Sequence, residues 1–192
     1  MKKKVVILII LIILLAALVG GAYWFWLKPK NQTNIIDDTT TSSSKNKPVI
    51  NKVIPAYIAS QKNLSTFSKY LQDSELLSTL NSNGPFTVFV PNNTAFSNLD
   101  QPTASVVFNN TSNNKAQNNI LAYQAVAGNL PSDQLSDGQK LKTVEGGEIV
   151  IQKEGSNIYV IDSKGNKAKV VTSDQKVSNG VVYTIDAVLL PQ

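Results

Sequence analysis

The chain of 192 residues contains no cysteine and no histidine, and all eighteen of its basic residues are lysine. The absence of cysteine excludes disulfide bonds and thiolate nucleophiles, and the absence of histidine removes the commonest catalytic base. Both residue types are also the usual ligands of zinc. We therefore expect no metal site and no cofactor site, and any catalysis would depend on serine, lysine and carboxylate side chains.

Net positive charge is confined to the N-terminal quarter of the chain. The formal net charge of +5 comes from residues 1–48, which hold seven lysines and two aspartates, whereas residues 49–192 hold eleven lysines and eleven acids. A nucleic-acid-binding domain needs a basic face that displaces counterions from phosphates. The neutral composition of residues 49–192 therefore predicts no nucleic-acid partner.

A long apolar run follows the three lysines at the N-terminus. Residues 5–27 are 23 consecutive uncharged and almost wholly apolar positions, enough for a helix that crosses a bilayer. A cleaved signal peptide, with cleavage near Gly20-Gly21-Ala22, is the alternative, but its apolar region is usually only about 7–15 residues long. The aromatic residues 23–26 suit the headgroup boundary. We predict an uncleaved transmembrane signal-anchor at 5–27, with residues 1–4 in the cytoplasm.

The next segment separates this predicted anchor from the rest of the chain. Residues 28–48 are rich in threonine, serine and asparagine and have too little apolar surface to fold. We predict a disordered polar linker with a reach of about 25 Å. Residues 49–192 show no internal repeat and are predicted to form one extracytoplasmic domain, so the protein is expected at the cell membrane as a single-pass chain.

The first half of the predicted domain has helical periodicity. Apolar residues recur at helical spacing over 49–58, where Pro55 is expected to interrupt or kink the helix, and again over 64–80. A further helix is predicted from about Lys115 to Val126, ended by Gly128.

The second half is β-prone. Residues 85–91 form a short run bracketed by prolines, typical of a buried strand that ends abruptly, with Val88 and Val90 on one face and Phe89 on the other. The near-continuous apolar run within 181–190 is typical of a central strand buried on both faces. Later β-prone runs, separated by glycine-containing turns, lie at 148–153, 157–162, 168–172 and 181–190. Helices followed by strands predict an α+β domain. Residues 162–166 lack the spacing of a calcium-binding loop and are predicted to form a turn.

Three ordered segments carry a family resemblance. The segments are GPFTVFVPNNTAF at 84–96, the central region at 120–149, and NGVVYTIDAVLLP at 179–191. Together they resemble the fasciclin domain family, in the family's order and at about its spacing. The resemblance implies a fasciclin-like domain over 49–192, with N-terminal helices packed on a β-sheet wedge.

The resemblance also nominates candidate ligand-contacting residues. Tyr123 and Gln124 occupy the position that family analogy associates with adhesion, and Asn92 and Asn93 lie in the first of the three matching segments. Family members usually have a histidine after the tyrosine, and Gln124 forms hydrogen bonds but does not titrate. The alternative is that Tyr123 packs beneath the sheet with its hydroxyl bonded. One of the two asparagines is also expected to cap the helix that begins at Thr94.

The sequence contains only weak matches to catalytic motifs. Ser112 and Ser173 each begin an S-x-x-K sequence, but both are predicted in loops and the companion motifs of serine acyl-enzymes are missing. Glu145 and Glu148 flank a turn-like sequence, where acids are ordinarily solvated, and are not expected to act as a glycosidase pair. We therefore predict no enzyme.

The expected function is that of a cell-surface, membrane-anchored fasciclin-domain protein that mediates adhesion or binds an extracellular protein or polysaccharide. The alternative is an extracytoplasmic small-molecule carrier, or an envelope enzyme of the serine/lysine type, on the same scaffold.

Overall fold

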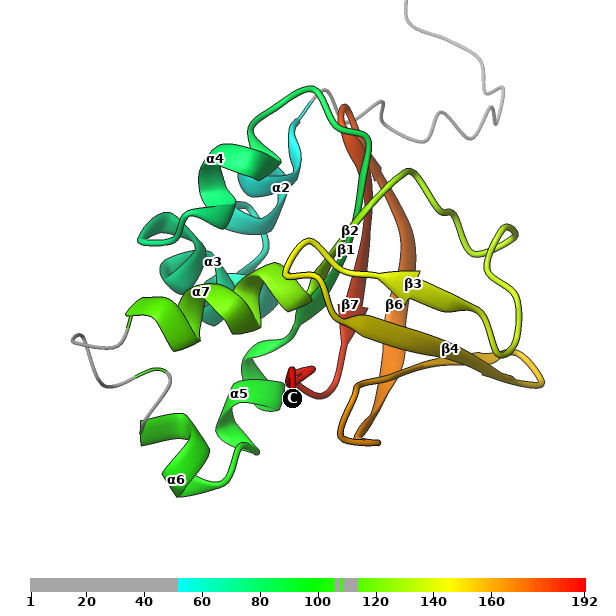
Figure 1. Cartoon of the computed structure of the whole chain (residues 1–192). Helices are drawn as coiled ribbons and strands as arrows, with labels where there is room; N and C mark the ends of the chain where they lie inside the picture. The colour runs from blue at the N-terminus through cyan, green and yellow to red at the C-terminus, as the bar shows by residue number, and fades with distance from the viewer. Residues whose placement is uncertain (1–51, 106–107, 109–113) are drawn as a thin grey trace, which may run out of the picture. The chain divides into compact units, whose positions relative to one another are not determined.

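A computed structural model of the chain describes residues 52–105, 108 and 114–192 (Figure 1). All of these belong to the second of two units into which the chain divides, residues 1–46 and 47–192. The predicted cytoplasmic segment 1–4, transmembrane helix 5–27 and linker 28–48 lie outside the described residues. No helix within the described ranges has the length and apolarity needed to cross a membrane.

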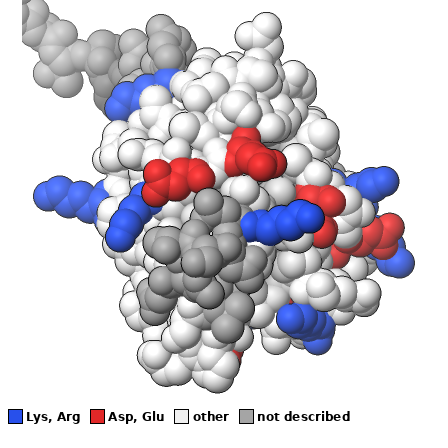
Figure 2. Space-filling model, turned by 60° about the vertical axis from the view of Figure 1, so that its left-hand side comes forward, with Lys and Arg blue, Asp and Glu red and all other residues white. Residues whose placement is uncertain are grey.

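Short helices make up most of the N-terminal half of the described domain. They are α2 (Ile54–Ala59), the 3-10 helix η1 (Lys62–Leu64), α3 (Ser65–Gln72), α4 (Leu76–Leu80), α5 (Asn93–Ser97), α6 (Gln101–Ala104) and α7 (Asn114–Tyr123). Helices α2, α3, α4 and α7 gather on one side of the sheet (Figure 1). On the face that this helical side presents, lysines and acids are interspersed among uncharged residues (Figure 2).

Seven strands form one sheet with the order β2-β1-β7-β6-β5-β4-β3. The strands are β1 (Phe86–Pro91), β2 (Ala125–Ala127), β3 (Lys140–Lys142), β4 (Glu148–Glu154), β5 (Asn157–Ile161), β6 (Lys167–Val177) and β7 (Gly180–Ile185). Only the β1–β7 pair is parallel. The α+β class predicted from the sequence is therefore confirmed.

The sheet curls until its two ends meet. An isolated bridge joins Val126 at the β2 end to Thr143 just after β3, and the Val144 amide donates to the Ala125 carbonyl oxygen over 2.7 Å. A curled sheet has an inside and an outside, so alternate residues of its strands point in opposite directions. The inside of this barrel-like sheet is filled by its own apolar core.

Two apolar cores meet at β1 and β7. Val88 and Val90 pack with the helices, while Phe89 points into the interior of the curled sheet and stacks with Tyr183 at 5.2 Å between ring centroids. Residues 181–185 of β7 are all buried between β1 and β6. The predicted alternation along β1 and the predicted central position of β7 are both confirmed.

The helix predictions over 49–58 and 115–126 are partly wrong. Pro55 does not kink a helix but stands in the first turn of α2, where a missing amide hydrogen costs nothing. Helix α7 ends at Tyr123, and the following residues pair with β1 as β2, with Ala125 opposite Val88. The pairing of these residues with β1 thus outweighs the helical spacing of apolar residues, on which the predicted helix continued to Val126.

The strand predictions at 168–172 and 181–190 also need correction. Strand β6 continues to Val177, because its second half pairs with β7 across two register shifts. Strand β7 ends at Ile185, because the amides of Leu189 and Leu190 bond to the side chains of Gln124 and Asp162 instead of a strand.

The start of β7 requires glycine. Gly180 lies opposite Phe86 with a φ of 153°, and a side chain there would overlap the Phe86 backbone. Its neighbour Asn179 is buried and connects this turn to the helices, because its side chain accepts from the Ile54 amide and donates to the carbonyl oxygens of Leu80 and Ser82.

Candidate functional site

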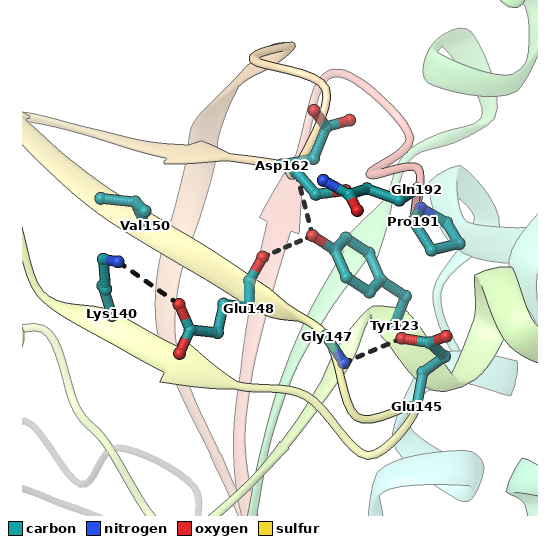
Figure 3. A pocket seen from close by; sticks show the side chains of 10 residues that line it. Tyr123, Lys140, Glu145, Gly147, Glu148, Val150, Asp162, Pro191 and Gln192 are labelled. Atoms are coloured by element: carbon teal, nitrogen blue, oxygen red, sulfur yellow. Dashed lines mark hydrogen bonds and ion pairs between the residues drawn. The ribbon is translucent and has the colours of Figure 1, made fainter.

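Tyr123 stands at the end of α7 and joins two β-hairpins. Its hydroxyl donates to the Glu148 carbonyl oxygen at 2.5 Å and accepts from the Ser163 amide at 3.0 Å (Figure 3). The whole residue is buried. The sequence alternative of a packed tyrosine with a bonded hydroxyl describes this position, and ligand contact by Tyr123 stays a prediction.

Gln124 is also enclosed, with none of its surface exposed. Its side-chain nitrogen donates to the carbonyl oxygens of Ile120 at 2.9 Å and Leu189 at 2.8 Å. The backbone carbonyl oxygen of Gln124 accepts from the Phe89 backbone amide at 2.9 Å. The side-chain amide of Gln124 thus joins α7 to the C-terminal segment, and its backbone carbonyl joins both to β1. A ligand at this position would meet the neighbours of Gln124 rather than its side chain.

Asn92 and Asn93 cap two different helices. The Asn92 side chain accepts from the Ala95 amide at 2.8 Å and caps α5, which confirms the predicted local cap. The Asn93 side chain accepts from the Thr66 amide in the first turn of α3 at 3.0 Å and donates to the Lys62 carbonyl oxygen at 3.0 Å. This long-range cap anchors α3 to the end of β1. Ligand contact by either asparagine stays a prediction.

A pocket of about 540 Å³ opens beside Tyr123, which stands behind it (Figure 3). We call it the Glu145–Glu148 pocket. Its side chains come from β3, β4, the turn between them, the turn between β5 and β6, and the C-terminal segment: Lys140, Glu145, Glu148, Val150, Ser163 and Gln192. Of the residues nominated from the sequence, Tyr123 lies at its back wall, whereas Gln124, Asn92 and Asn93 do not line it. Residues that were not nominated for binding form its accessible surface.

Each charged side chain at the rim of the pocket interacts with one neighbouring group. The Lys140 ammonium lies 3.5 Å from a Glu148 carboxylate oxygen, and both side chains remain largely exposed, at 70% and 59%. One Glu145 oxygen accepts from the Gly147 amide at 2.9 Å. A side chain at Gly147 would lie 2.9 Å from the Tyr123 ring, so the turn needs glycine to pack against it.

Asp162 forms the far wall of the pocket and organises a turn. The residue is only 5% exposed, and its carboxylate accepts from the amides of Lys164, Asn166 and Leu190 and from the Asn166 side chain. The predicted turn at 162–166 is therefore confirmed, because the Asp162 carboxylate accepts hydrogen bonds from the backbone amides of the turn and from the Asn166 side chain.

A second polar cluster lies on the opposite end of the sheet around Asp174, in the bulged part of β6. Asp174 has a φ of 57° and accepts from both the amide and the hydroxyl of Ser132. Burial raises the pKa of Asp174, but the Ser132 hydrogen bonds outweigh burial and leave it below its ordinary value. Burial first, and then the Asp174 charge, raise the pKa of the Tyr183 phenol, which donates to the Leu130 carbonyl oxygen at 2.7 Å.

The S-x-x-K prediction at Ser173 placed that residue in a loop, which is wrong because Ser173 lies within β6. Ser112 lies outside the described residues. Within the described part of the chain, no group of three or more aspartates and glutamates is arranged to hold a metal ion. Every buried side-chain nitrogen and oxygen in those residues has a hydrogen-bond partner.

Tyr123 is the one pocket residue that the sequence nominated for ligand contact, and its side chain is buried behind the accessible surface. Glu145 and Glu148 stood out only as a pair around a turn, and the turn at 162–166 stood out only as a turn. No local pattern could join them, because the pocket is made where the two hairpins and the C-terminal segment converge on Tyr123.

Comparison with known proteins places this fold and site in context. The fasciclin domain family profile matches residues 62–191. The chain is 31% identical over 133 residues to protein sll1483 of Synechocystis sp., covering 69% of this chain and 70% of that protein. It is 37% identical over 117 residues to immunogenic protein MPT70 of Mycobacterium tuberculosis, covering 60% of this chain and 54% of that protein.

The likeness extends to an animal protein and to a solved structure. Human periostin is 30% identical over 143 residues, which cover 74% of this chain but only 16% of periostin. A solved FAS1 domain pair from the insect cell adhesion molecule Fasciclin I superposes with a TM-score of 0.65 at 22% identity, covering 74% of this chain and 52% of that one. By the extent of the family match and by its fold, the chain belongs to the fasciclin domain family.

Proposed function

We propose that this protein is a cell-surface binding or adhesion protein that presents one fasciclin domain outside the cell. Residues 5–27 hold it in the membrane, residues 1–4 stay in the cytoplasm, and residues 28–48 form a flexible linker to the domain. The ligand is an extracellular protein or polysaccharide, and the domain works by binding rather than by catalysis.

The observation that carries this proposal is membership of the fasciclin family together with the shared fold of a domain pair from an insect cell adhesion molecule. The interior of the domain supports binding as well. The buried polar side chains of the described residues are engaged in hydrogen bonds, so the polar groups left for a partner lie on the surface. The largely exposed Lys140 and Glu148 at the pocket are of this kind.

The membrane arrangement is tested by lysine labelling on intact cells that produce the full chain. A membrane-impermeant amine reagent should modify lysines of residues 49–192 on intact cells and should modify residues 2–4 only after lysis. Labelling of the domain only after lysis would contradict the arrangement. Loss of residues 1–21 from the mature chain would instead favour a cleaved signal peptide.

Adhesion is tested with the full chain displayed in many copies on vesicle-coated beads, because single-module contacts are often weak and multivalency raises their effective strength. We expect saturable binding to envelope material from the source organism, with competition by free protein. Matched beads that carry only residues 1–48 are the control. Equal retention of both bead types would contradict the proposal.

A further inference from the structure

We propose that the Glu145–Glu148 pocket binds a neutral saccharide unit, and that this contact supplies the ligand recognition of the domain. The inference rests on the proposed binding function and names its ligand class. It is carried by the size of the pocket, by the donors and acceptors at its rim, and by the balance of charge around it.

The pocket has the dimensions of a small-ligand site. Its volume of about 540 Å³ lies within the range of roughly 300–1,000 Å³ that is common for such sites. Its walls combine polar groups with the apolar side chains of Val150 and Pro191. A sugar ring presents C–H groups on its faces and hydroxyls around its edge, so both kinds of wall have a matching surface.

Lys140 and Glu148 form a donor and acceptor pair suited to neighbouring hydroxyls. Their nitrogen and oxygen are 3.5 Å apart, and both side chains are mostly exposed. Each sugar hydroxyl donates one hydrogen bond and accepts others. One hydroxyl therefore donates to the Glu148 carboxylate while the next accepts from the Lys140 ammonium. An exposed ion pair is worth little on its own, so rearranging it around a ligand costs little.

Glu145 adds a second acceptor whose position is fixed before binding. One of its oxygens is held by the Gly147 amide, and Gly147 packs against the Tyr123 ring, leaving the other carboxylate oxygen for a ligand. Tyr123 in turn holds both the Glu148 backbone and the Ser163 amide. Acceptor groups whose position is fixed before the ligand binds lose less conformational entropy on binding, and this raises the affinity.

The charge balance favours a neutral ligand over a charged one. Three carboxylates and one ammonium line the pocket, so an anionic polysaccharide would meet repulsion. A basic side chain at Glu148 would lie beside the Lys140 ammonium and be repelled by it, which a neutral hydroxyl is not, and Asp162 is almost fully buried beneath four N–H donors. Only Glu145 would remain for the cation, whereas a neutral hydroxyl ligand uses all the accessible groups.

The outer face of the sheet allows the ligand to continue beyond the pocket. Val150 lies between Lys140 of β3 and Ile161 of β5 in one row of aligned residues, and Gln152 lies opposite Tyr159 in the next row. No described helix covers this side of β3, β4 and β5 (Figure 1). An oligosaccharide should therefore bind more tightly than the corresponding single sugar.

The test is isothermal titration calorimetry of the full-length chain in a detergent without a sugar headgroup, since a glycosidic detergent would occupy the same pocket. The neutral probes are tetrasaccharides of glucose, mannose, galactose and N-acetylglucosamine at up to millimolar concentration. An oligogalacturonate tests anionic saccharides, and trilysine tests basic peptides. We expect saturable binding of at least one neutral probe, and weaker or no binding of the two charged ones.

Two matched variants locate the site. Glu148→Ala removes an exposed β4 carboxylate inside the pocket, and Glu154→Ala removes the exposed carboxylate at the other end of β4, which pairs with Lys167. We expect the dissociation constant of the neutral probe to rise about tenfold or more in Glu148→Ala and less than twofold in Glu154→Ala. Circular dichroism of both variants verifies that each remains folded.

The outcomes separate this inference from the proposed function. Equal effects of the two variants, or tighter binding of trilysine or oligogalacturonate than of every neutral probe, would overturn the saccharide site. Failure of all neutral probes would also overturn it. In each case the bead assay decides independently whether the protein binds envelope material, and retention there would keep the adhesion proposal with another ligand or surface.

Discussion

Asn179 should be one of the most sensitive polar positions in the domain. Its side chain is 5% exposed and makes three hydrogen bonds of 2.7–2.9 Å to Leu80, Ser82 and Ile54. Replacement by alanine leaves two carbonyl oxygens and one amide without this partner. At about 0.5–1.5 kcal/mol for each hydrogen bond, Asn179→Ala should lower the free energy of unfolding by about 2–4 kcal/mol.

The measurement is urea unfolding of residues 47–192, followed by far-ultraviolet circular dichroism. For a domain of this size the loss corresponds to a fall in melting temperature on the order of 6–12 °C. Ser178→Ala is the matched control, because it changes the exposed neighbouring side chain and should alter stability by less than about 0.5 kcal/mol.

An isosteric variant sharpens the test. Asn179→Asp keeps the shape of the side chain but replaces the two N–H donors with a carboxylate that faces the carbonyl oxygens of Leu80 and Ser82. The Ile54 amide still donates to one carboxylate oxygen, but the other oxygen faces only carbonyl oxygens, and a buried charge satisfied in this incomplete way is strongly unfavourable. Asn179→Asp should therefore destabilise the domain near neutral pH at least as much as Asn179→Ala. If the aspartate variant unfolded at the wild-type urea concentration, the assignment of the donors would be refuted.

Three further predictions concern the other polar contacts. Asn93→Ala should lower the unfolding free energy by about 1 kcal/mol in urea unfolding, because α3 loses its long-range cap, whereas Thr94→Ala at the exposed neighbour should be nearly neutral. Tyr123→Phe should cost about 1–3 kcal/mol in the same assay, since both hairpin contacts of the hydroxyl are lost, and a silent substitution would contradict the bridging role. The lowered pKa of Asp174 stabilises the fold above the ordinary aspartate pKa of about 3.9, and this contribution is lost as the pH falls through the lower folded-state pKa. Acid titration should therefore show a smaller loss of stability in Asp174→Asn than in wild type over that range, and identical titration curves would argue against the contribution.

Some elements of the fold could be predicted from local patterns. The run from Phe86 to Pro91 combines alternating apolar side chains with a terminal proline, and it forms β1 with the predicted alternation. Asn92 makes a local cap with Ala95, which depends only on residues three apart. The cap could be predicted because its partner is close in sequence, and the strand because its alternation and its terminal proline are local features.

Other elements could not be predicted because distant partners decide them. Ala125 and Val126 fit a helical pattern, yet they form β2 because β1 offers an edge to pair with. The second half of β6 has polar residues typical of a loop, but it pairs with β7 through two register shifts. Backbone hydrogen bonds to neighbouring strands outweigh the small local preferences of these residues.

The same distinction holds for the candidate site. The residue types alone show that the domain is neutral and has no thiol or imidazole chemistry. The sequence also carried the resemblance to fasciclin domains, which nominated Tyr123 and Gln124 as candidate ligand contacts. Only the tertiary structure buried both side chains and brought Lys140, Glu145, Glu148 and Ser163 around one pocket. The physical reason is that burial and convergence depend on how the sheet curls and where the C-terminal segment packs, and both are set by contacts between residues far apart in the chain.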